Sequence, residues 1–312
     1  MREDTLKKKI IRLALFLCTF LIVLVILSAI FDVLRSQNPE YVSEVDTGLW
    51  LSLNEPSDTV DIMIVGDSET LSMIQPRQFY ADTGSTAYIA GGAGQAVAEC
   101  YYTLKYLYRD QSPKLIILES NLLTEPFRKS EYYTSIRNIT EYYLPIFRTH
   151  NVWGYLAGNS IPWRKSDKGW ISRNNIIPGV NSDYMSPDLH PEVYEIPAIR
   201  KYYISQIKKL CEENGSELLV VTMPSARNFN YSKLTALQQE FEQQNISYLD
   251  LNTRNDEIGI DWTVDTADEG DHINDTGMLK VMPYLEQYLE ENYDLPDHRG
   301  DAAYDSWYPV EQ

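Results

Sequence analysis

The sequence has few cysteines and few basic residues, and each shortage excludes a class of protein. Its three cysteines are Cys18, Cys100 and Cys211, and neither a C-x-x-C pair nor a Cys/His zinc spacing occurs. We expect Cys100 and Cys211 to be small core residues, with a disulfide between them as the alternative. Only 27 lysines and arginines face 45 acidic residues, so the net charge at pH 7 is −18. A surface this acidic repels nucleic acid, and we expect no nucleic-acid partner.

Neither a P-loop nor a G-x-S-x-G motif occurs, so the sequence does not point to nucleotide hydrolysis or to a nucleophile-elbow hydrolase. The chain is nevertheless typical of a folded protein, with 312 residues, 44% hydrophobic and 12% aromatic. That length can bury one sizeable core.

One long apolar run lies near the N-terminus. Residues 13–31 carry no charge and are long enough to span a membrane as a helix. Lys7, Lys8, Lys9 and Arg12 stand just before the run, whereas only Arg35 is basic just after it, which predicts that residues 1–12 are cytoplasmic and that the rest of the chain is outside. We therefore expect a single-pass membrane anchor. A cleaved signal peptide is the alternative, although Leu27-Ser28-Ala29 is a poor cleavage site.

After a stem over residues 32–57, the pattern alternates between short apolar runs and amphipathic stretches. Residues 58–293 thus predict an α/β domain with a parallel sheet and helices on both faces. The predicted strands are 60–65, 86–90, 114–118, 218–222 and 248–251, and the main predicted helices are 95–108, 199–210, 232–244 and 278–289. Substrate sites in such sheets form at the carboxyl ends of the strands.

Two segments break this alternation. Residues 124–195 are rich in Tyr, Trp, Pro, Asn and Ser, and we expect an insertion over the top of the sheet that contributes to a binding surface. Residues 294–312 form an acidic tail that we expect to be loosely ordered.

The first candidate for chemistry is Gly66-Asp67-Ser68, which follows the first predicted strand directly. A serine there can present both its hydroxyl and its N–H to the site, and glycine permits the sharp turn. Alternatively, Asp67 and Ser68 only cap the next helix.

The second candidate is the acidic loop that ends in His272, just before the last predicted helix. An imidazole can take the proton of a serine when a carboxylate fixes its tautomer. Asp268 and Glu269 are the candidate acids, with Asp268 slightly preferred. The alternatives are an exposed histidine on an acidic loop and a metal site, which the lack of a second nearby histidine disfavours. We expect neither a metal nor another cofactor.

Together, these two blocks resemble those of the SGNH (GDSL-like) hydrolase superfamily. The resemblance implies a three-layer, flavodoxin-like parallel sheet, with Ser68 as nucleophile and His272 as its base. It also implies an oxyanion hole formed by the N–H groups of Ser68 and Gly94 and the amide of Asn121. The block around Asn121 departs from the family's Gly-x-Asn-Asp pattern at Glu119 and Leu122.

Such a site performs acyl transfer. A single-span anchor with an external catalytic domain resembles the DltD- and AlgJ-like groups, which work beside a multi-span membrane O-acyltransferase. The resemblance therefore implies O-acetylation or a related acylation of a cell-envelope or exported carbohydrate polymer. The alternatives are a surface esterase that removes acyl groups and a non-catalytic binding or scaffold protein.

Overall fold

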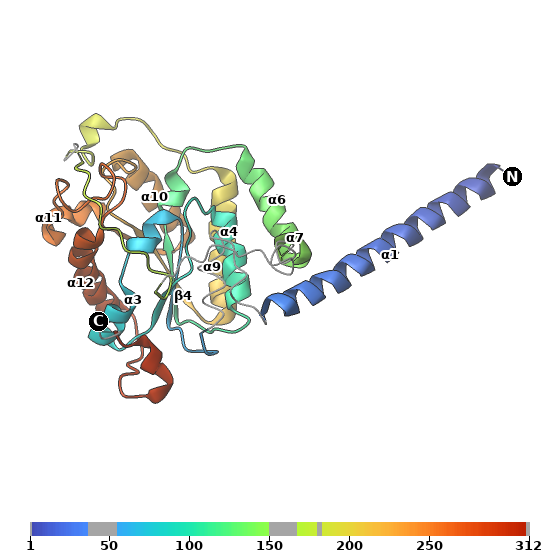
Figure 1. Ribbon diagram of the computed structural model, residues 1–312. Helices are drawn as coiled ribbons and strands as arrows, with labels where there is room; N and C mark the ends of the chain where they lie inside the picture. The colour runs from blue at the N-terminus through green and yellow to red at the C-terminus, as the bar shows by residue number, and fades with distance from the viewer. Residues whose placement is uncertain (1, 37–54, 150–166, 180–182, 310–312) are drawn as a thin grey trace. The chain divides into compact units, whose positions relative to one another are not determined.

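The computed structural model describes residues 2–36, 55–149, 167–179 and 183–309 (Figure 1). The chain divides into two compact units, Met1–Ser43 with Ser135–Trp163, and Glu44–Thr134 with Arg164–Gln312. Part of the predicted insertion thus groups with the N-terminal helix. Most of the predicted stem lies outside the described residues.

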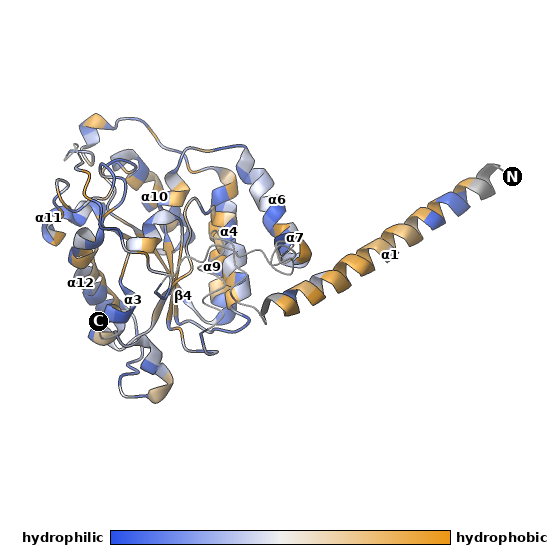
Figure 2. Ribbon diagram, in the orientation of Figure 1, coloured by the Kyte–Doolittle hydropathy of each residue, from blue (hydrophilic) through white to orange (hydrophobic). Residues whose placement is uncertain are grey.

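The first unit contains the predicted apolar helix. α1 (Arg2–Ser36) includes Leu6–Leu34, which is long and apolar enough to cross a membrane, with a mean hydropathy of 3.0. Figure 2 shows hydrophobic residues along most of α1 and hydrophilic residues toward its N-terminal end. A signal sequence has the same properties, so the helix fits both alternatives that the sequence leaves open. In the same unit, the N–H of Ile146 donates to Ser28 Oγ at 3.3 Å.

The second unit is built on a parallel sheet of five strands in the order β2-β1-β3-β4-β5. This is the flavodoxin-like order, and it confirms the predicted fold class. All five predicted strands are present, with ends within two residues of the prediction. They are β1 (Ile62–Val65), β2 (Ala87–Ile89), β3 (Leu115–Glu119), β4 (Glu217–Thr222) and β5 (Ser247–Asp250).

The sheet is covered on both faces, which explains why its central strands are continuously apolar. Figure 1 shows α4 and α9 on one side of the sheet and α3 and α12 on the other. Alternate residues of β1, β3 and β4 pack with α12 in one buried cluster.

The larger helices are α3 (Pro76–Thr83), α4 (Val97–Leu107), α6 (Ser130–Tyr143), α9 (Ala198–Asn214), α10 (Tyr231–Gln244) and α12 (Asp275–Asn292). The shorter ones are η3 (Ser68–Ser72), α5 (Asn121–Thr124), α7 (Ile146–Thr149), η4 (Pro187–Leu189), η5 (Asn252–Arg254), α11 (Asn255–Ile258) and η6 (Ala302–Trp307).

The order of the strands determines where a site can form. The chain adds β2 on one side of β1 and then returns to add β3 on the other side. The crevice at this switch point lies outside the carboxyl ends of β1 and β3. Ser68 follows β1 and Asn121 follows β3, so both lie at this edge of the sheet.

The tail differs from the prediction of loose order. Its helix η6 carries Trp307, which is completely buried, and the ring lies edge-on to Tyr88 of β2. Lys168 Nζ lies 4.1 Å from the centre of the indole ring. Arg77 Nη1 also donates to the carbonyl oxygens of Ser306 and Tyr308. The buried Trp307 thus anchors a segment that is otherwise mostly polar. The amino-acid composition of the tail does not indicate this anchor.

We expect Trp307→Ala to lower the free energy of unfolding by about 3–5 kcal/mol, because it leaves a cavity against Tyr88 and removes the cation–π contact with Lys168. Urea unfolding of the full chain measures the change. Leu279→Ala is the control, since Leu279 is 58% exposed on α12, and it should change stability by no more than about 0.5 kcal/mol. Equal effects of the two variants would show that the tail does not contribute to the folded core.

Candidate active site

The turn after β1 presents Ser68 at the carboxyl end of the sheet. Gly66 has a φ of +155°, and a Cβ there would lie 2.7 Å from both Glu119 Cβ and Thr70 Cγ2. Only glycine fits such a close approach of chains. Ser68 is then the first residue of η3 and is half-buried. Arg173 Nη2, from the insertion, donates to the Ser68 carbonyl oxygen at 2.7 Å.

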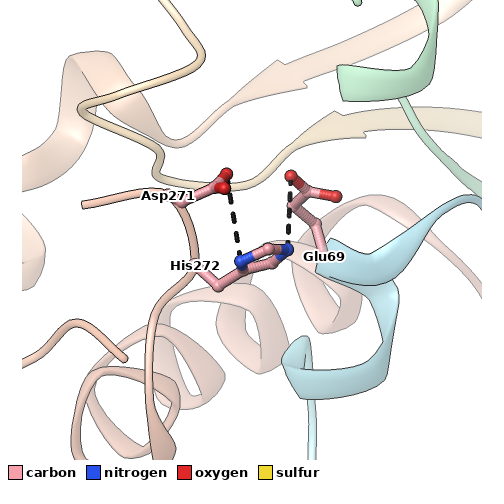
Figure 3. Close-up of side chains that lie close together, drawn as sticks. All are labelled: Glu69, Asp271 and His272. Atoms are coloured by element: carbon pink, nitrogen blue, oxygen red, sulfur yellow. Dashed lines mark ion pairs between the residues drawn. The ribbon is translucent and has the colours of Figure 1, made fainter. Parts of the chain in front are cut away.

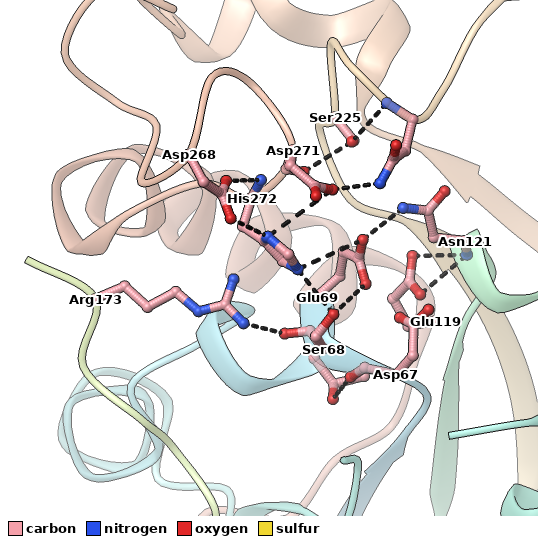
Figure 4. Close-up of polar contacts among 12 residues, drawn as sticks. Asp67, Ser68, Glu69, Glu119, Asn121, Arg173, Ser225, Asp268, Asp271 and His272 are labelled. Atoms are coloured by element: carbon pink, nitrogen blue, oxygen red, sulfur yellow. Dashed lines mark hydrogen bonds and ion pairs between the residues drawn. The ribbon is translucent and has the colours of Figure 1, made fainter. Parts of the chain in front are cut away.

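His272 meets Ser68 from the other end of the chain. Ser68 Oγ lies 2.7 Å from His272 Nε2, and Asp268 Oδ2 lies 2.7 Å from Nδ1 (Figure 4). Asp268 Oδ1 also accepts the backbone N–H of His272 at 2.7 Å. The three side chains therefore form a continuous chain of hydrogen bonds from hydroxyl to imidazole to carboxylate, which is the arrangement that makes a serine nucleophilic.

A tight loop lets Asp268 reach the imidazole. Glu269 and Gly270 both have positive φ, at 62° and 90°, and reverse the chain between Asp268 and His272. Thr266 Oγ1 supports the turn, because it accepts the N–H of Gly270 at 2.7 Å and donates to the His272 carbonyl at 3.0 Å.

Of the two acids that the sequence leaves open, the structure brings Asp268 to the imidazole and turns Glu269 away. The Glu269 side chain is 60% exposed and pairs with Arg227 at 2.7 Å. Asp271, adjacent to the histidine, has a carboxylate oxygen 3.8 Å from Nδ1 and accepts a hydrogen bond from Asn228.

Of the three expected oxyanion-hole residues, Asn121 lies differently from the prediction. Asn121 is completely buried, and its Nδ2 donates to Glu69 Oε1 at 2.6 Å instead of pointing into open space. Gly94 has a φ of +68°, and among the described residues no hydrogen bond joins it to Ser68, His272 or Asn121. The role of Gly94 stays a prediction.

Sequence reasoning missed Glu69 and Arg173. Glu69 is 4% exposed, with Oε2 at 3.3 Å from Ser68 Oγ and Oε1 at 3.9 Å from His272 Nε2. Figure 3 shows Glu69 and Asp271 on opposite sides of the imidazole. A signal for Glu69 exists in the sequence, since a charged residue directly follows the candidate nucleophile at the end of a buried strand. For Arg173 no local signal exists.

Three buried carboxyl groups lie together behind the serine. Burial raises the pKa values of Asp67 and Glu69 well above their usual range, and each of these groups also feels a neighbouring acid. Burial, with the nearby charge of Glu69, also raises the pKa of Glu119 to about 8. Both Glu119 oxygens accept the N–H of Asn121 at 2.9 Å. This cluster favours protonated acids at neutral pH.

Among the described residues, two groups of ligand atoms could hold a metal ion. One consists of Glu69, Asp271 and His272, and the other of Asp67, Glu69 and Glu119, and the ligand atoms within each group lie within 4.8 Å of one another. In the first group, however, both imidazole nitrogens already contact Ser68 and Asp268. The geometry of His272 therefore favours proton transfer over metal binding.

The raised pKa of Glu119 makes stability depend on pH. Because the folded state holds this proton more tightly than the unfolded state, its stabilising effect is complete below the unfolded pKa of about 4.3 and is lost as the pH rises through about 8. We expect Glu119→Gln to raise the free energy of unfolding relative to the unmodified chain at pH 9, by up to about 5 kcal/mol, and to change it much less at pH 4. Urea titrations at the two pH values measure the difference, and an equal effect at both would contradict the expectation.

No protein-family model and no curated protein matches the chain. Among solved structures it is similar to a putative acylhydrolase from Bacteroides fragilis NCTC 9343, at 11% identity over 77% of this chain and 93% of that one, with a TM-score of 0.41. It is also similar to a psychrotrophic esterase from Pseudoalteromonas sp., at 11% identity over 75% and 98%, with a TM-score of 0.40. An acetyl xylan esterase is 12% identical over 73% and 99%, with a TM-score of 0.40. Because these TM-scores are low, any proposal about the chemistry of this chain depends on the geometry of its own site.

Proposed function

We propose that this chain is a serine acyl-transfer enzyme of the SGNH type, with Ser68 as nucleophile, His272 as general base and Asp268 as the acid that orients it. The observation that supports the proposal is the unbroken contact from Ser68 Oγ to Nε2 and from Nδ1 to Asp268, at 2.7 Å each. Ser68 follows the first strand and His272 lies in the loop before the last helix, so the contact joins residues 204 positions apart in the sequence.

The reaction follows from these contacts. Ser68 Oγ attacks the acyl carbon while its proton passes to His272 Nε2, and the carbonyl electrons move onto oxygen as an oxyanion. The oxyanion collapses, the bond to the leaving group breaks, and Nε2 returns the proton to that group. An acceptor hydroxyl then gives its proton to Nε2 and attacks the acyl carbon of the acyl-Ser68 ester. The bond from Ser68 Oγ to the acyl carbon breaks, Nε2 returns the proton to Oγ, and the acylated product leaves.

Mass spectrometry of the full chain after a brief incubation with p-nitrophenyl acetate tests the first half of this reaction. We expect an acetyl group on Ser68 and a burst of nitrophenol that matches the amount of enzyme. Label on another residue, or steady release without an acyl-enzyme, would contradict the assignment of the nucleophile.

The acceptor that we propose is a hydroxyl of a cell-envelope or exported carbohydrate polymer, with a multi-span membrane acyltransferase as the partner that delivers the acyl group. The support is the sequence resemblance to the DltD- and AlgJ-like groups, together with an apolar helix that would hold the domain at a membrane surface. Adding a sugar polyol to the acetylated enzyme separates transfer from hydrolysis. Acetylated sugar indicates a transferase, whereas acetate alone indicates an esterase.

A further inference from the structure

The carboxyl group of Glu69 lies beside the nucleophile of the proposed reaction. Its Oε2 is 3.3 Å from Ser68 Oγ, while its Oε1 accepts the amide N–H of Asn121 at 2.6 Å (Figure 4). An ionised carboxylate in this place would repel the negative charge that develops on the acyl oxygen. The protonation state of Glu69 therefore decides whether the site can work.

The hydrogen bonds around Ser68 indicate that state. Ser68 has a single hydroxyl proton, and in the reactive arrangement that proton points along the 2.7 Å contact to His272 Nε2. With that proton directed at Nε2, Ser68 Oγ can only accept from Glu69 Oε2, and a hydrogen bond across their 3.3 Å contact then requires that Glu69 carries the proton. In the neutral acid, Oε1 acts as the carbonyl oxygen that accepts from Asn121, and Oε2 acts as the donor.

The surrounding charges are consistent with a neutral Glu69. The acids that influence it are Asp67 after β1, Glu119 at the end of β3 and Asp271 beside His272. On the cationic side, His272 lies 3.9 Å away, and Arg173 and Lys233 interact with Glu69 at longer range. Burial is the largest effect and raises the pKa of Glu69, the charge of Asp67 raises it further, and His272 and Asn121 act in the opposite direction.

We propose that Glu69 is a catalytic residue that, as a neutral carboxylic acid, donates a hydrogen bond from Oε2 to the acyl oxyanion, while Asn121 holds its Oε1. This proposal depends on the acyl-transfer function above. The acid keeps its proton throughout: when Ser68 Oγ bonds to the acyl carbon, the donor shifts from Oγ to the new oxyanion, and it shifts back when the leaving-group bond breaks. A buried acid kept neutral in an apolar site can serve as such a donor.

The comparison of Glu69→Gln with Glu69→Ala tests the proposal. A glutamine amide reproduces the neutral acid, because its oxygen can accept from Asn121 and its NH₂ can donate to the oxyanion. We expect Glu69→Ala to lower kcat for p-nitrophenyl acetate by about 10²- to 10³-fold, the usual cost of one oxyanion donor. Glu69→Gln should be at least about tenfold faster than the alanine variant.

The pH profile of kcat supplies a second readout that a merely structural role would not produce. Activity should fall at alkaline pH as Glu69 ionises, since the new anion opposes the oxyanion. The glutamine variant should lose this alkaline limb. If the alanine variant does not fold, this comparison with the unmodified chain decides alone.

The outcomes separate this proposal from the function on which it rests. If the unmodified chain forms no acyl-Ser68, the acyl-transfer function is wrong. If it does form acyl-Ser68 but Glu69→Gln is as slow as Glu69→Ala, then the site requires a carboxylate, as a base or cation ligand would, and the donor role is wrong. An alkaline limb that persists in Glu69→Gln also overturns the donor role.

Discussion

Ser68→Ala should lower kcat for an activated acetyl ester by about 10⁴- to 10⁶-fold, because loss of a serine nucleophile removes nearly all of the catalysis that the linked residues provide. No acetyl-enzyme should form, and the nitrophenol burst should disappear. Binding of the ester should change little, so the effect should appear in kcat more than in KM.

Ser72→Ala is the matched control for this variant. Ser72 lies at the end of the same short helix and is 1% exposed, and its Oγ has no hydrogen-bond partner among the described residues. Removing an unpaired buried hydroxyl should leave activity intact and be neutral or slightly stabilising. If Ser68→Ala keeps more than about a hundredth of the activity, or if both variants lose it equally, Ser68 is not the nucleophile that the triad chemistry requires.

The strands were predictable because their physical signal is local. A strand covered by helices on both faces is continuously apolar, and Val60–Val65 and Leu218–Thr222 therefore stand out in the sequence. Their succession with amphipathic helices implies a parallel sheet, and the parallel sheet in turn places Ser68 and His272 at one edge. The broad location of the site thus follows from pattern alone.

The contacts within the site were less predictable, because they depend on distant groups. The family resemblance implies an oxyanion role for Asn121, which follows β3, yet its amide binds Glu69, a residue of η3 after β1. Arg173 reaches Ser68 from a segment without helical or strand periodicity. Similarly, Trp307 is the one tryptophan in a mostly polar tail, and its contacts with Tyr88 of β2 and with Lys168 make it part of the core.

The choice between Asp268 and Glu269 shows why spacing alone was insufficient. By the family's spacing, the acid lies three residues before the histidine, which is Glu269 here. The positive φ values of Glu269 and Gly270 turn the loop so that Asp268, four residues before the histidine, faces Nδ1. Gly270 was a local hint of this turn, and a glycine in such a loop permits the left-handed conformation.

Asp268→Asn should lower kcat by about 10²- to 10⁴-fold, and the reason lies in the tautomer of His272. Asp268 Oδ1 accepts the backbone N–H of His272 at 2.7 Å. In the asparagine variant this N–H holds the amide oxygen in place, so the NH₂ group faces Nδ1. Nδ1 must then accept a hydrogen bond, the ring proton moves to Nε2, and Nε2 can no longer take the proton of Ser68.

Exposure sets the size of this effect. The Asp268 side chain is 41% exposed, so water can partly replace it as a partner of the imidazole, and we expect a loss toward the lower end of that range. Glu269→Gln is the matched control, because it makes the same chemical change one residue away and affects only an exposed pair with Arg227. Its kcat should stay within about twofold of the unmodified chain, since exposed ion pairs contribute little. A large loss in Glu269→Gln beside a fully active Asp268→Asn would reverse the assignment and would require the loop to refold so that Glu269 faces Nδ1.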